Sequence, residues 1–334
     1  MIGCSSLTLN TQDHKHLLAR TMDFTIEMAE EVIFVPRGGK SFKTNYTSAA
    51  KITAKYANMG IGQLNDHAPI LFDGLNEKGL MGATLYFPRY AHYSQKMMPE
   101  RTNVSPDKVI ATVLATAANL TEAATLFKNS LNIVAQENAT IGTVPPLHYI
   151  FSDQSGASLI VEPRADGVQL IEDSIGVMTN SPDYRWHENN LRNYLTVTAQ
   201  QHAPVKFLNK TLFPFSQGSG TFGLPGDYTP PPARFIRVAF LKNAATQAAN
   251  EIAGISLLHH ILEAVSIPQG AVVTERGTQD YTCYTAYMCA ESLSFYFSTY
   301  FNQRINKISL APLLLEKDYK IFKINNHEDL HELN

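Results

Sequence analysis

The sequence predicts an α+β fold in which two antiparallel sheets pack on each other and helices cover their outer faces. The 334 residues are 44% hydrophobic and 17% charged, which supplies a sizeable core and excludes disorder for the bulk of the chain. Strand-like runs joined by tight turns dominate, as in antiparallel sheets. The helical stretches come in consecutive pairs and not as single crossovers between parallel strands. No repeat or linker divides the chain, so we expect a single domain.

The first part of the chain consists of strand patterns. Asn76-Glu77-Lys78-Gly79 is a strong hairpin turn between two of them. Two helices follow. Ser105-Pro106-Asp107 is typical of a helix start that runs to about Ala118, and Thr121-Glu122 begins a helix that extends through Phe127. The predicted strands of this part are 5–10, 16–24, 31–36, 69–75 and 80–87.

The second part alternates strands, helices and strands. Its last segment, residues 271–310, is dense in Tyr, Thr, Phe and Val, which favours a closing antiparallel meander. The other predicted strands are 147–153, 158–163 and 167–179, and the predicted helices are 183–195, 232–250 and 256–265.

Charge and cysteine usage exclude several classes of protein. The chain has 27 Lys and Arg against 30 Asp and Glu, a net charge of −3, and no basic run. It therefore lacks the positive footprint of a nucleic-acid-binding protein or of one that binds an anionic membrane. The longest apolar stretches, such as Ile252–Val265, are too short to span a membrane. Three cysteines and the absence of a signal peptide indicate a reduced, cytoplasmic setting.

Two sequence motifs suggest a metal or a cofactor but occur in the wrong context. His327-Glu328-Asp329-Leu330-His331 matches a zinc-protease pattern, yet it lies in a polar stretch near the last residue of the sequence. Residues 218–223 match a dinucleotide-binding fingerprint, but Pro225 blocks the helix that would receive the phosphates. There is also no Gly-x-Ser-x-Gly element, which excludes the usual serine hydrolase. We therefore expect no metal and no cofactor.

Cys4 is the unusual residue. Loss of Met1-Ile2-Gly3 would leave Cys4 with both a thiol and a free α-amine, whose ordinary pKa values, about 8.5 and about 8, are close enough for the amine to take the thiol proton. Gly3 would let the preceding peptide bond adopt a strained geometry open to attack by that thiol. The sequence thus favours a propeptide of residues 1–3 and a mature domain of residues 4–334. The alternative is an ordinary buried cysteine in an edge strand.

The spacing of the first two strands brings charged residues towards this cysteine. A hairpin centred at residues 12–14 would place Cys4 opposite some residue between 20 and 24. That window contains Arg20, whose charge would favour the thiolate, and Asp23, whose carboxylate would orient the amine. Side chains along a regular strand point alternately to its two faces, which puts Arg20 and Asp23 on opposite faces. Both can reach Cys4 only if the strand bends or bulges. A surface ion pair is the alternative interpretation.

Several stretches of the sequence resemble the choloylglycine hydrolase family, which includes the bile salt hydrolases and penicillin V acylases and belongs to the N-terminal nucleophile hydrolases. They are spread over nearly the whole chain in the family's order. This resemblance implies an αββα sandwich of four layers, which agrees with the layered fold predicted above. The stretches are 1–7 with 18–24, 76–86, 176–182 and 232–238.

The resemblance also implies roles for individual residues. Cys4 matches the nucleophile, Arg20 its guanidinium neighbour, and Asp23 the carboxylate that contacts the amine. Asn180 matches an oxyanion-hole amide; a turn residue before Ser181-Pro182 is the alternative. Arg234 matches a second active-site arginine, or is a charge at a helix start. Tyr86 occupies an oxyanion-hole position that is typically Asn in bile salt hydrolases and Tyr in penicillin V acylases.

We therefore expect a cysteine amidohydrolase that acts on a linear amide. Because of Tyr86, phenoxymethylpenicillin is the first substrate predicted, ahead of conjugated bile salts and N-acyl homoserine lactones. A catalytically silent binding protein with the same fold is the alternative from another class. The sequence leaves two roles open for the aromatic side chains of Phe24, Tyr86, Phe87 and Tyr90: they line the acyl pocket, or they belong to the core. The resemblance further implies a homotetramer, and we expect the loop at 216–232 to reach a neighbouring subunit.

Overall fold

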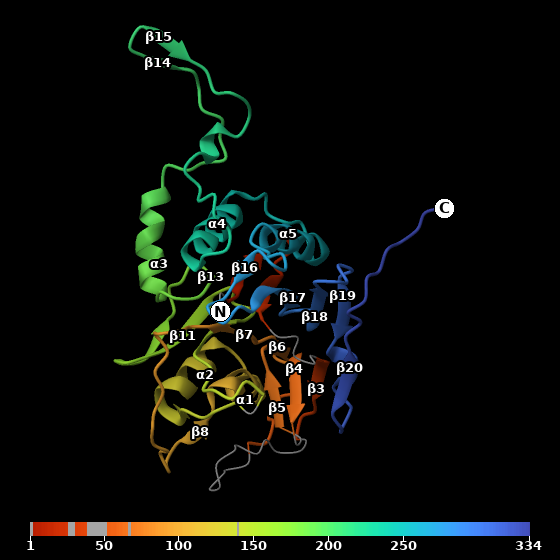
Figure 1. The fold of residues 1–334 in the computed structure, drawn as a ribbon. Helices are drawn as coiled ribbons and strands as arrows, with labels where there is room; N and C mark the ends of the chain where they lie inside the picture. Colours follow the sequence, from red (N-terminus) through yellow and green to blue (C-terminus); the bar gives the residue numbers. More distant parts are fainter. Residues whose placement is uncertain (1–2, 26–30, 39–51, 66–67, 139) are drawn as a thin grey trace.

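The computed structural model describes residues 3–25, 31–38, 52–65, 68–138 and 140–334. It confirms the predicted α+β architecture, in which two antiparallel sheets face each other between two layers of helices (Figure 1). Helices α4 (Pro231–Ala244) and α5 (Glu251–Glu263) pack on the outer face of the first sheet. Helices α1 (Val109–Thr116) and α2 (Leu120–Thr125) pack on the outer face of the second.

The first sheet carries the N-terminal hairpin at its centre. Strand β1 pairs with β2 in the register Ser6 opposite Arg20, and β2 then pairs with β17. The predicted hairpin is therefore confirmed, with paired positions that fall inside the expected range. The strands in sheet order are β13 (Val177–Met178), β1 (Ser5–Asn10), β2 (His16–Phe24), β17 (Gln279–Cys289), β18 (Ser294–Thr299) and β19 (Asn306–Ser309), with β16 (Val272–Val273) paired to β17.

The second sheet contains the predicted turn at residues 76–79, which joins β6 to β7. Strands β2 and β7 contact each other across the space between the two sheets. The strands in sheet order are β12 (Gly167–Ile171), β11 (Ser158–Arg164), β10 (Leu147–Ser152), β7 (Met81–Tyr86), β6 (Asp73–Asn76), β4 (Asn58–Asn65), β3 (Glu31–Val35) and β20 (Lys320–Lys323), with β5 (Ala68–Leu71) paired to β4.

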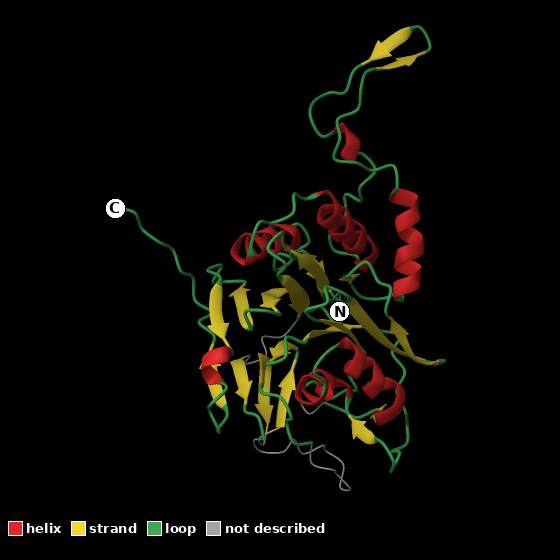
Figure 2. Ribbon diagram, turned by 180° about the vertical axis from the view of Figure 1, so that it is seen from behind, coloured by secondary structure: helices red, strands yellow, loops and turns green. Residues whose placement is uncertain are grey.

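The remaining elements lie outside these layers. They include α3 (Tyr184–Leu191), which stands beside α4 (Figure 2). The others are the short helices η1 (Pro106–Lys108), η2 (Leu126–Ser130), η3 (Arg192–Tyr194), η4 (Ser219–Thr221) and η5 (Ala311–Leu313), and the strand pairs β8 (Thr102–Val104) with β9 (Leu131–Ile133) and β14 (Val205–Phe207) with β15 (Lys210–Leu212).

Apolar side chains fill two regions. One cluster lies between the two sheets and continues under α4 and α5; Leu7, Leu18 and Ile150 belong to it, and all are fully buried. The other lies between the second sheet and α1; it includes Val113 and Phe151. Cys4 belongs to the first cluster. The start of β1 is thus held inside the molecule, between the sheets.

The predicted strand over residues 167–179 is wrong in one respect, because it is two strands in different sheets. β12 ends at Ile171 in the second sheet, and β13 begins at Val177 in the first. The chain crosses between the sheets at Gly176, whose φ of 67° favours glycine. This crossing carries Asn180 to the start of β1.

Helix boundaries and several strands also differ from the prediction. The helix predicted over 232–250 ends at Ala244, and α5 begins at Glu251, where the Asn250 side chain accepts a hydrogen bond from the Ala253 N–H. Strand β4 was not predicted because Gly60 and Gly62 have low strand propensity. Their small size is required there, since a Cβ on Gly60 would lie 1.9 Å from the carbonyl oxygen of Asp73.

A long arm projects from the body of the protein beside α3. Its tip is the β14–β15 hairpin (Figure 1). This hairpin precedes the loop at 216–232, in which Ser219 and Gly220 are buried. Residues 327–331 lie in irregular, largely exposed chain, not on a helix, and Asp329 pairs with Arg304. Among the described helices, none has the length and apolar character needed to cross a membrane.

Candidate active site

Cys4 lies directly before β1 and is 3% exposed. Its Sγ accepts a hydrogen bond from Arg20 Nη2 over 3.2 Å. Burial raises the pKa of the Cys4 thiol, and the positive charge of Arg20 opposes this rise. The guanidinium is therefore placed to stabilise a thiolate at this position.

Arg20 is fully buried in β2 and is held on several sides. Nη1 donates to Asp73 Oδ2 over 3.3 Å and to the Tyr284 hydroxyl over 3.0 Å, and Nη2 also donates to the Thr84 carbonyl oxygen. Burial acts to lower the pKa of Arg20, but Cys4, Tyr284 and Asp73 raise it overall. Arg20 is thus a fixed cation beside the sulfur and not a surface residue.

Asp23 contacts Cys4 through its backbone, whereas Arg20 contacts Cys4 through its side chain. The Asp23 backbone hydrogen-bonds the Cys4 thiol, while the Asp23 carboxylate accepts from the Thr282 hydroxyl over 2.7 Å and from the Thr21 hydroxyl over 3.3 Å. Burial raises the pKa of Asp23, and the charge of Arg234 opposes this. The predicted bulge is not in the Asp23 strand: the register shift lies opposite it, between Thr282 and Tyr284 of β17.

Asn180 and Tyr86 meet beside the residue that precedes Cys4. Asn180 Nδ2 donates to the Tyr86 carbonyl oxygen over 2.7 Å. A Cβ on Gly3 would lie 2.5 Å from Asn180 Nδ2 and 2.9 Å from Tyr86 Cβ. The φ of Gly3 lies outside the left-handed region, so close approach, and not the predicted strain, is what requires glycine here.

Arg234 connects Asn180 to the start of β1. It lies in the first turn of α4, at a helix start, and is fully buried. Nη2 donates to Asn180 Oδ1 over 2.6 Å, and Nη1 donates to the Cys4 carbonyl oxygen and to Ser5 Oγ, each over 2.7 Å. Burial lowers the pKa of Arg234, against the effect of Asp23 and Cys4.

Two buried histidines hold the backbone around Asn180. His148 Nε2 lies 2.9 Å from the carbonyl oxygen of Thr179, and His187 Nε2 lies 2.8 Å from the carbonyl oxygen of Asn180. Each ring is stacked on an aromatic side chain, His148 on Phe87 and His187 on Phe235. The peptide that carries Asn180 is therefore fixed from two directions.

A pocket opens next to Cys4, Arg20 and Asp23. It encloses about 630 Å³ of empty space once its open mouth is included. Of the aromatic residues for which the sequence left both roles open, Phe24 and Tyr86 line the pocket, whereas Phe87 is buried against His148. The apolar part of the wall includes Met22, Phe24, Phe72, Tyr86, Ile141 and Leu147.

Sequence reasoning missed the residues that hold these groups in place. Asp73, Tyr284 and Thr282 support Arg20 and Asp23, and His148 and His187 support the Asn180 backbone. A charged residue inside the otherwise apolar stretch 69–75 was the available signal for Asp73. Nothing in the sequence marks the two histidines.

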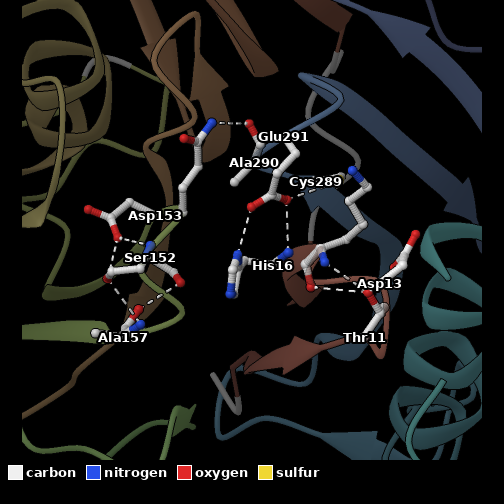
Figure 3. Close-up of polar contacts among 12 residues, drawn as sticks. Thr11, Asp13, His16, Ser152, Asp153, Ala157, Cys289, Ala290 and Glu291 are labelled. Carbon is white, nitrogen blue, oxygen red and sulfur yellow. Dashed lines mark hydrogen bonds and ion pairs between the residues drawn. The ribbon is translucent and has the colours of Figure 1, made fainter. Parts of the chain in front are cut away.

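Another cysteine lies beside a histidine and a carboxylate, but it lacks the features of a nucleophile. Glu291 accepts from the His16 backbone N–H and lies 2.6 Å from His16 Nδ1, and Cys289 Sγ is 3.7 Å from Glu291 (Figure 3). Burial raises the pKa of Cys289 to about 11. No cationic side chain donates to its sulfur among the described residues, in contrast to Cys4.

Comparison with known proteins identifies the family. A statistical model of the choloylglycine hydrolase family of linear amide C–N hydrolases matches residues 4–327. A bile salt hydrolase/transferase of Clostridium perfringens is 35% identical over 99% of this chain and 100% of its own length. A conjugated bile acid hydrolase of Lactobacillus acidophilus is 30% identical, covering 88% of this chain and 91% of its own.

Solved structures agree with this result. A variant of the conjugated bile acid hydrolase from Clostridium perfringens superposes with a TM-score of 0.90 at 35% identity, over 99% of this chain and 100% of that one. The penicillin V acylase of Agrobacterium tumefaciens, at a TM-score of 0.76 and 22% identity over 97% and 92% of the two chains, shares the fold. The chain belongs to the choloylglycine hydrolase family and is a linear amide C–N hydrolase of the N-terminal nucleophile fold.

Proposed function

We propose that this enzyme hydrolyses conjugated bile salts, cleaving the amide between a steroid acid and a small polar amine. The observation that carries the proposal is the 35% identity, over the full length of both chains, with a bile salt hydrolase/transferase. The pocket beside Cys4 supports it, because its wall is mostly apolar and a steroid acid is a largely apolar acyl group.

Penicillin V hydrolysis, which the sequence placed first, is the second candidate. The observation in its favour is Tyr86, whose ring lines the pocket and offers a flat face to an aromatic acyl group. The structural likeness to a penicillin V acylase, at 22% identity, extends to the fold alone. The relatives therefore favour bile salts over the substrate that Tyr86 suggested.

In this proposal the chain must first be matured by removal of residues 1–3. Gly3 lies against Asn180 and Tyr86, so the Gly3–Cys4 peptide bond occupies the place of a substrate amide. Attack by the Cys4 thiol and hydrolysis would release residues 1–3, of which Met1 and Ile2 lie outside the described residues. The α-amine of Cys4 would then be free, with the Asp23 carboxylate to orient it.

Catalysis by the mature enzyme uses the same groups. The α-amine of Cys4 takes the thiol proton, with Arg20 beside the sulfur, and Sγ bonds to the amide carbon. Asn180 Nδ2 donates to the resulting oxyanion, a contact worth about 3 kcal/mol in comparable enzymes. The C–N bond breaks as the amine leaves with the proton. Water then hydrolyses the thioester, the C–S bond breaks, and the acid is released.

The location and assembly of the enzyme are part of the proposal as well. The three cysteines all lie within the described residues and form no disulfide bond, which supports a reducing cytoplasm. The projecting arm supports a homotetramer, because it leaves large apolar side chains exposed: Phe207 is 63% and Phe215 103% exposed.

Initial rates on two kinds of substrate test the proposed function. The mature enzyme is supplied with glycocholate, taurocholate and phenoxymethylpenicillin under the same conditions, and kcat/KM is compared. We expect the bile salts to have the higher value. A higher value for phenoxymethylpenicillin would make the second candidate correct, and Tyr86→Asn should then raise the relative rate on bile salts.

A further inference from the structure

The pocket beside Cys4 contains a polar group that the proposed reaction does not use. Asp107, at the start of η1, lines the pocket together with Asn138 and Gln63. Gln63 belongs to β4 of the second sheet, and Asp107 and Asn138 belong to segments outside both sheets, whereas Cys4, Arg20 and Asp23 belong to the N-terminal part of the first sheet. A substrate that enters the pocket from Cys4 therefore meets apolar walls and a second polar surface.

The side chains at this surface are fixed in orientation. Asp107 Oδ1 accepts from the Ser105 hydroxyl over 2.5 Å, and Oδ2 accepts from Asn138 Nδ2 over 2.7 Å. A carboxylate has about four acceptor positions, so both oxygens can accept further hydrogen bonds. Asp107 is half-buried and is not a freely rotating surface residue.

The side-chain hydroxyl of Thr84 also indicates a ligand with hydroxyl groups. Thr84 is 6% exposed and lines the same pocket, on the same face of β7 as Tyr86. Among the described residues its Oγ1 has no hydrogen-bond partner. A buried hydroxyl without a partner is costly, and a ligand that supplies the partner removes this cost.

Charge decides which part of the substrate lies here. The amine released from a conjugated bile salt carries an anionic carboxylate or sulfonate, which the Asp107 carboxylate would repel. The acyl part is uncharged near its ring system, and its hydroxyl groups are hydrogen-bond donors. The apolar wall and the free acceptor positions of Asp107 therefore fit the acyl part.

We propose that Asp107 accepts hydrogen bonds from hydroxyl groups of the acyl part, with Asn138 and Gln63 beside it, and that Thr84 Oγ1 makes a second contact with this part. This inference rests on the proposed function. The pocket then selects acyl groups that carry hydroxyl groups on an apolar ring system. It discriminates against acyl groups of similar size without them, because those leave the remaining acceptor positions of Asp107 and the buried Thr84 hydroxyl without partners.

The test compares two substrates that differ only in hydroxyl groups: glycocholate and the glycine conjugate of unhydroxylated cholanic acid. The readout is the ratio of their kcat/KM values in the native enzyme, in Asp107→Asn and in Thr84→Val. We expect Asp107→Asn to lower this ratio by about tenfold or more and Thr84→Val by several-fold. Asp166→Asn, an exposed aspartate in the β11–β12 turn, is the matched control and should retain the native ratio.

Each outcome has one meaning. Ratios within twofold of the native value in both folded variants would overturn the inference while leaving bile salt hydrolysis intact. No cleavage of either steroid conjugate by the native enzyme would instead refute the proposed function. Thr84→Val preserves the shape of the side chain and changes no charge, so it decides the question if Asp107→Asn does not fold.

Discussion

Arg234 Nη2 donates a hydrogen bond to Asn180 Oδ1 over 2.6 Å, and both side chains are buried. Nη1 of the same guanidinium donates to the carbonyl oxygen of Cys4. One cation thus sets the position of the proposed oxyanion-hole amide relative to the proposed nucleophile. Because Oδ1 is occupied by Arg234, the amide must present Nδ2 towards Tyr86 and Gly3.

Asn180→Ala should lower kcat by roughly a hundredfold or more, because it removes a donor to the oxyanion. The matched control is Asn189→Ala, which removes an exposed amide in α3 and should change kcat little. Steady-state rates and the urea midpoint of each variant are measured together. An Asn180→Ala enzyme that is less stable but retains its native rate per folded molecule would favour the role of a turn residue.

Gly3→Ala should block or greatly slow removal of residues 1–3. The new Cβ would lie 2.5 Å from Asn180 Nδ2 and 2.9 Å from Tyr86 Cβ, so the bond to be cleaved would move out of place. Cys4→Ala should retain residue 3 entirely, since it lacks the thiol. Intact-mass measurement of the purified chains distinguishes these species from loss of Met1 alone. An active enzyme whose first residue is still Ile2 would refute maturation at Cys4.

The local sequence pattern predicted the fold and the part of the candidate site that lies on the first hairpin. Strands 5–10 and 16–24 are short, apolar and joined by a tight turn, so their pairing and the approach of Arg20 to Cys4 follow from turn geometry. Asn180 and Arg234 are more than 170 residues from Cys4 in sequence. Only the family resemblance placed them at the site, because no local signal encodes a contact between segments so far apart in the chain.

The residues that the sequence missed are those whose role depends on tertiary packing. His148 and His187 lie in different elements, and each becomes relevant only because its ring meets a carbonyl oxygen of the crossing segment. The sequence predicted an interruption between helices 232–250 and 256–265, yet α5 begins at Glu251 and contains Gly254, where a Cβ would come 2.5 Å from Leu17. The low helix propensity of glycine favours a break in the helix at this position, but close packing against β2 requires glycine there.

The arm predicts the assembly of the enzyme. We expect a homotetramer in solution, and we expect the double variant Phe207→Ser, Phe215→Ser to have a lower molar mass, because these apolar side chains are exposed in the single chain. Light scattering coupled to gel filtration measures the mass. The control is Leu333→Ser, in the exposed tail, which should keep the native mass. A native enzyme that is monomeric at micromolar concentration would contradict the prediction.

His187 should make the stability of the enzyme depend on pH. Its ring is 2% exposed, and burial lowers its pKa to about 4, against the hydrogen bond to the Asn180 backbone. The usual value in an unfolded chain is about 6.5. Between pH 6.5 and pH 4 the unfolded chain therefore binds a proton at His187 that the folded chain does not. Stability from this group is complete above pH 6.5 and is lost as the pH falls towards 4.

His187→Gln isolates this contribution, because glutamine can still donate to the Asn180 carbonyl oxygen but does not titrate. The free energy of unfolding, measured in urea at pH 7.5, 6, 5 and 4.5, should fall more steeply for the native enzyme than for the variant. The full difference should be on the order of 3 kcal/mol, since each pKa unit corresponds to about 1.4 kcal/mol. His260→Gln changes an exposed histidine of α5 and should leave the native slope in place. Equal slopes for the native enzyme and His187→Gln would mean that burial does not lower the pKa of His187 in the folded enzyme.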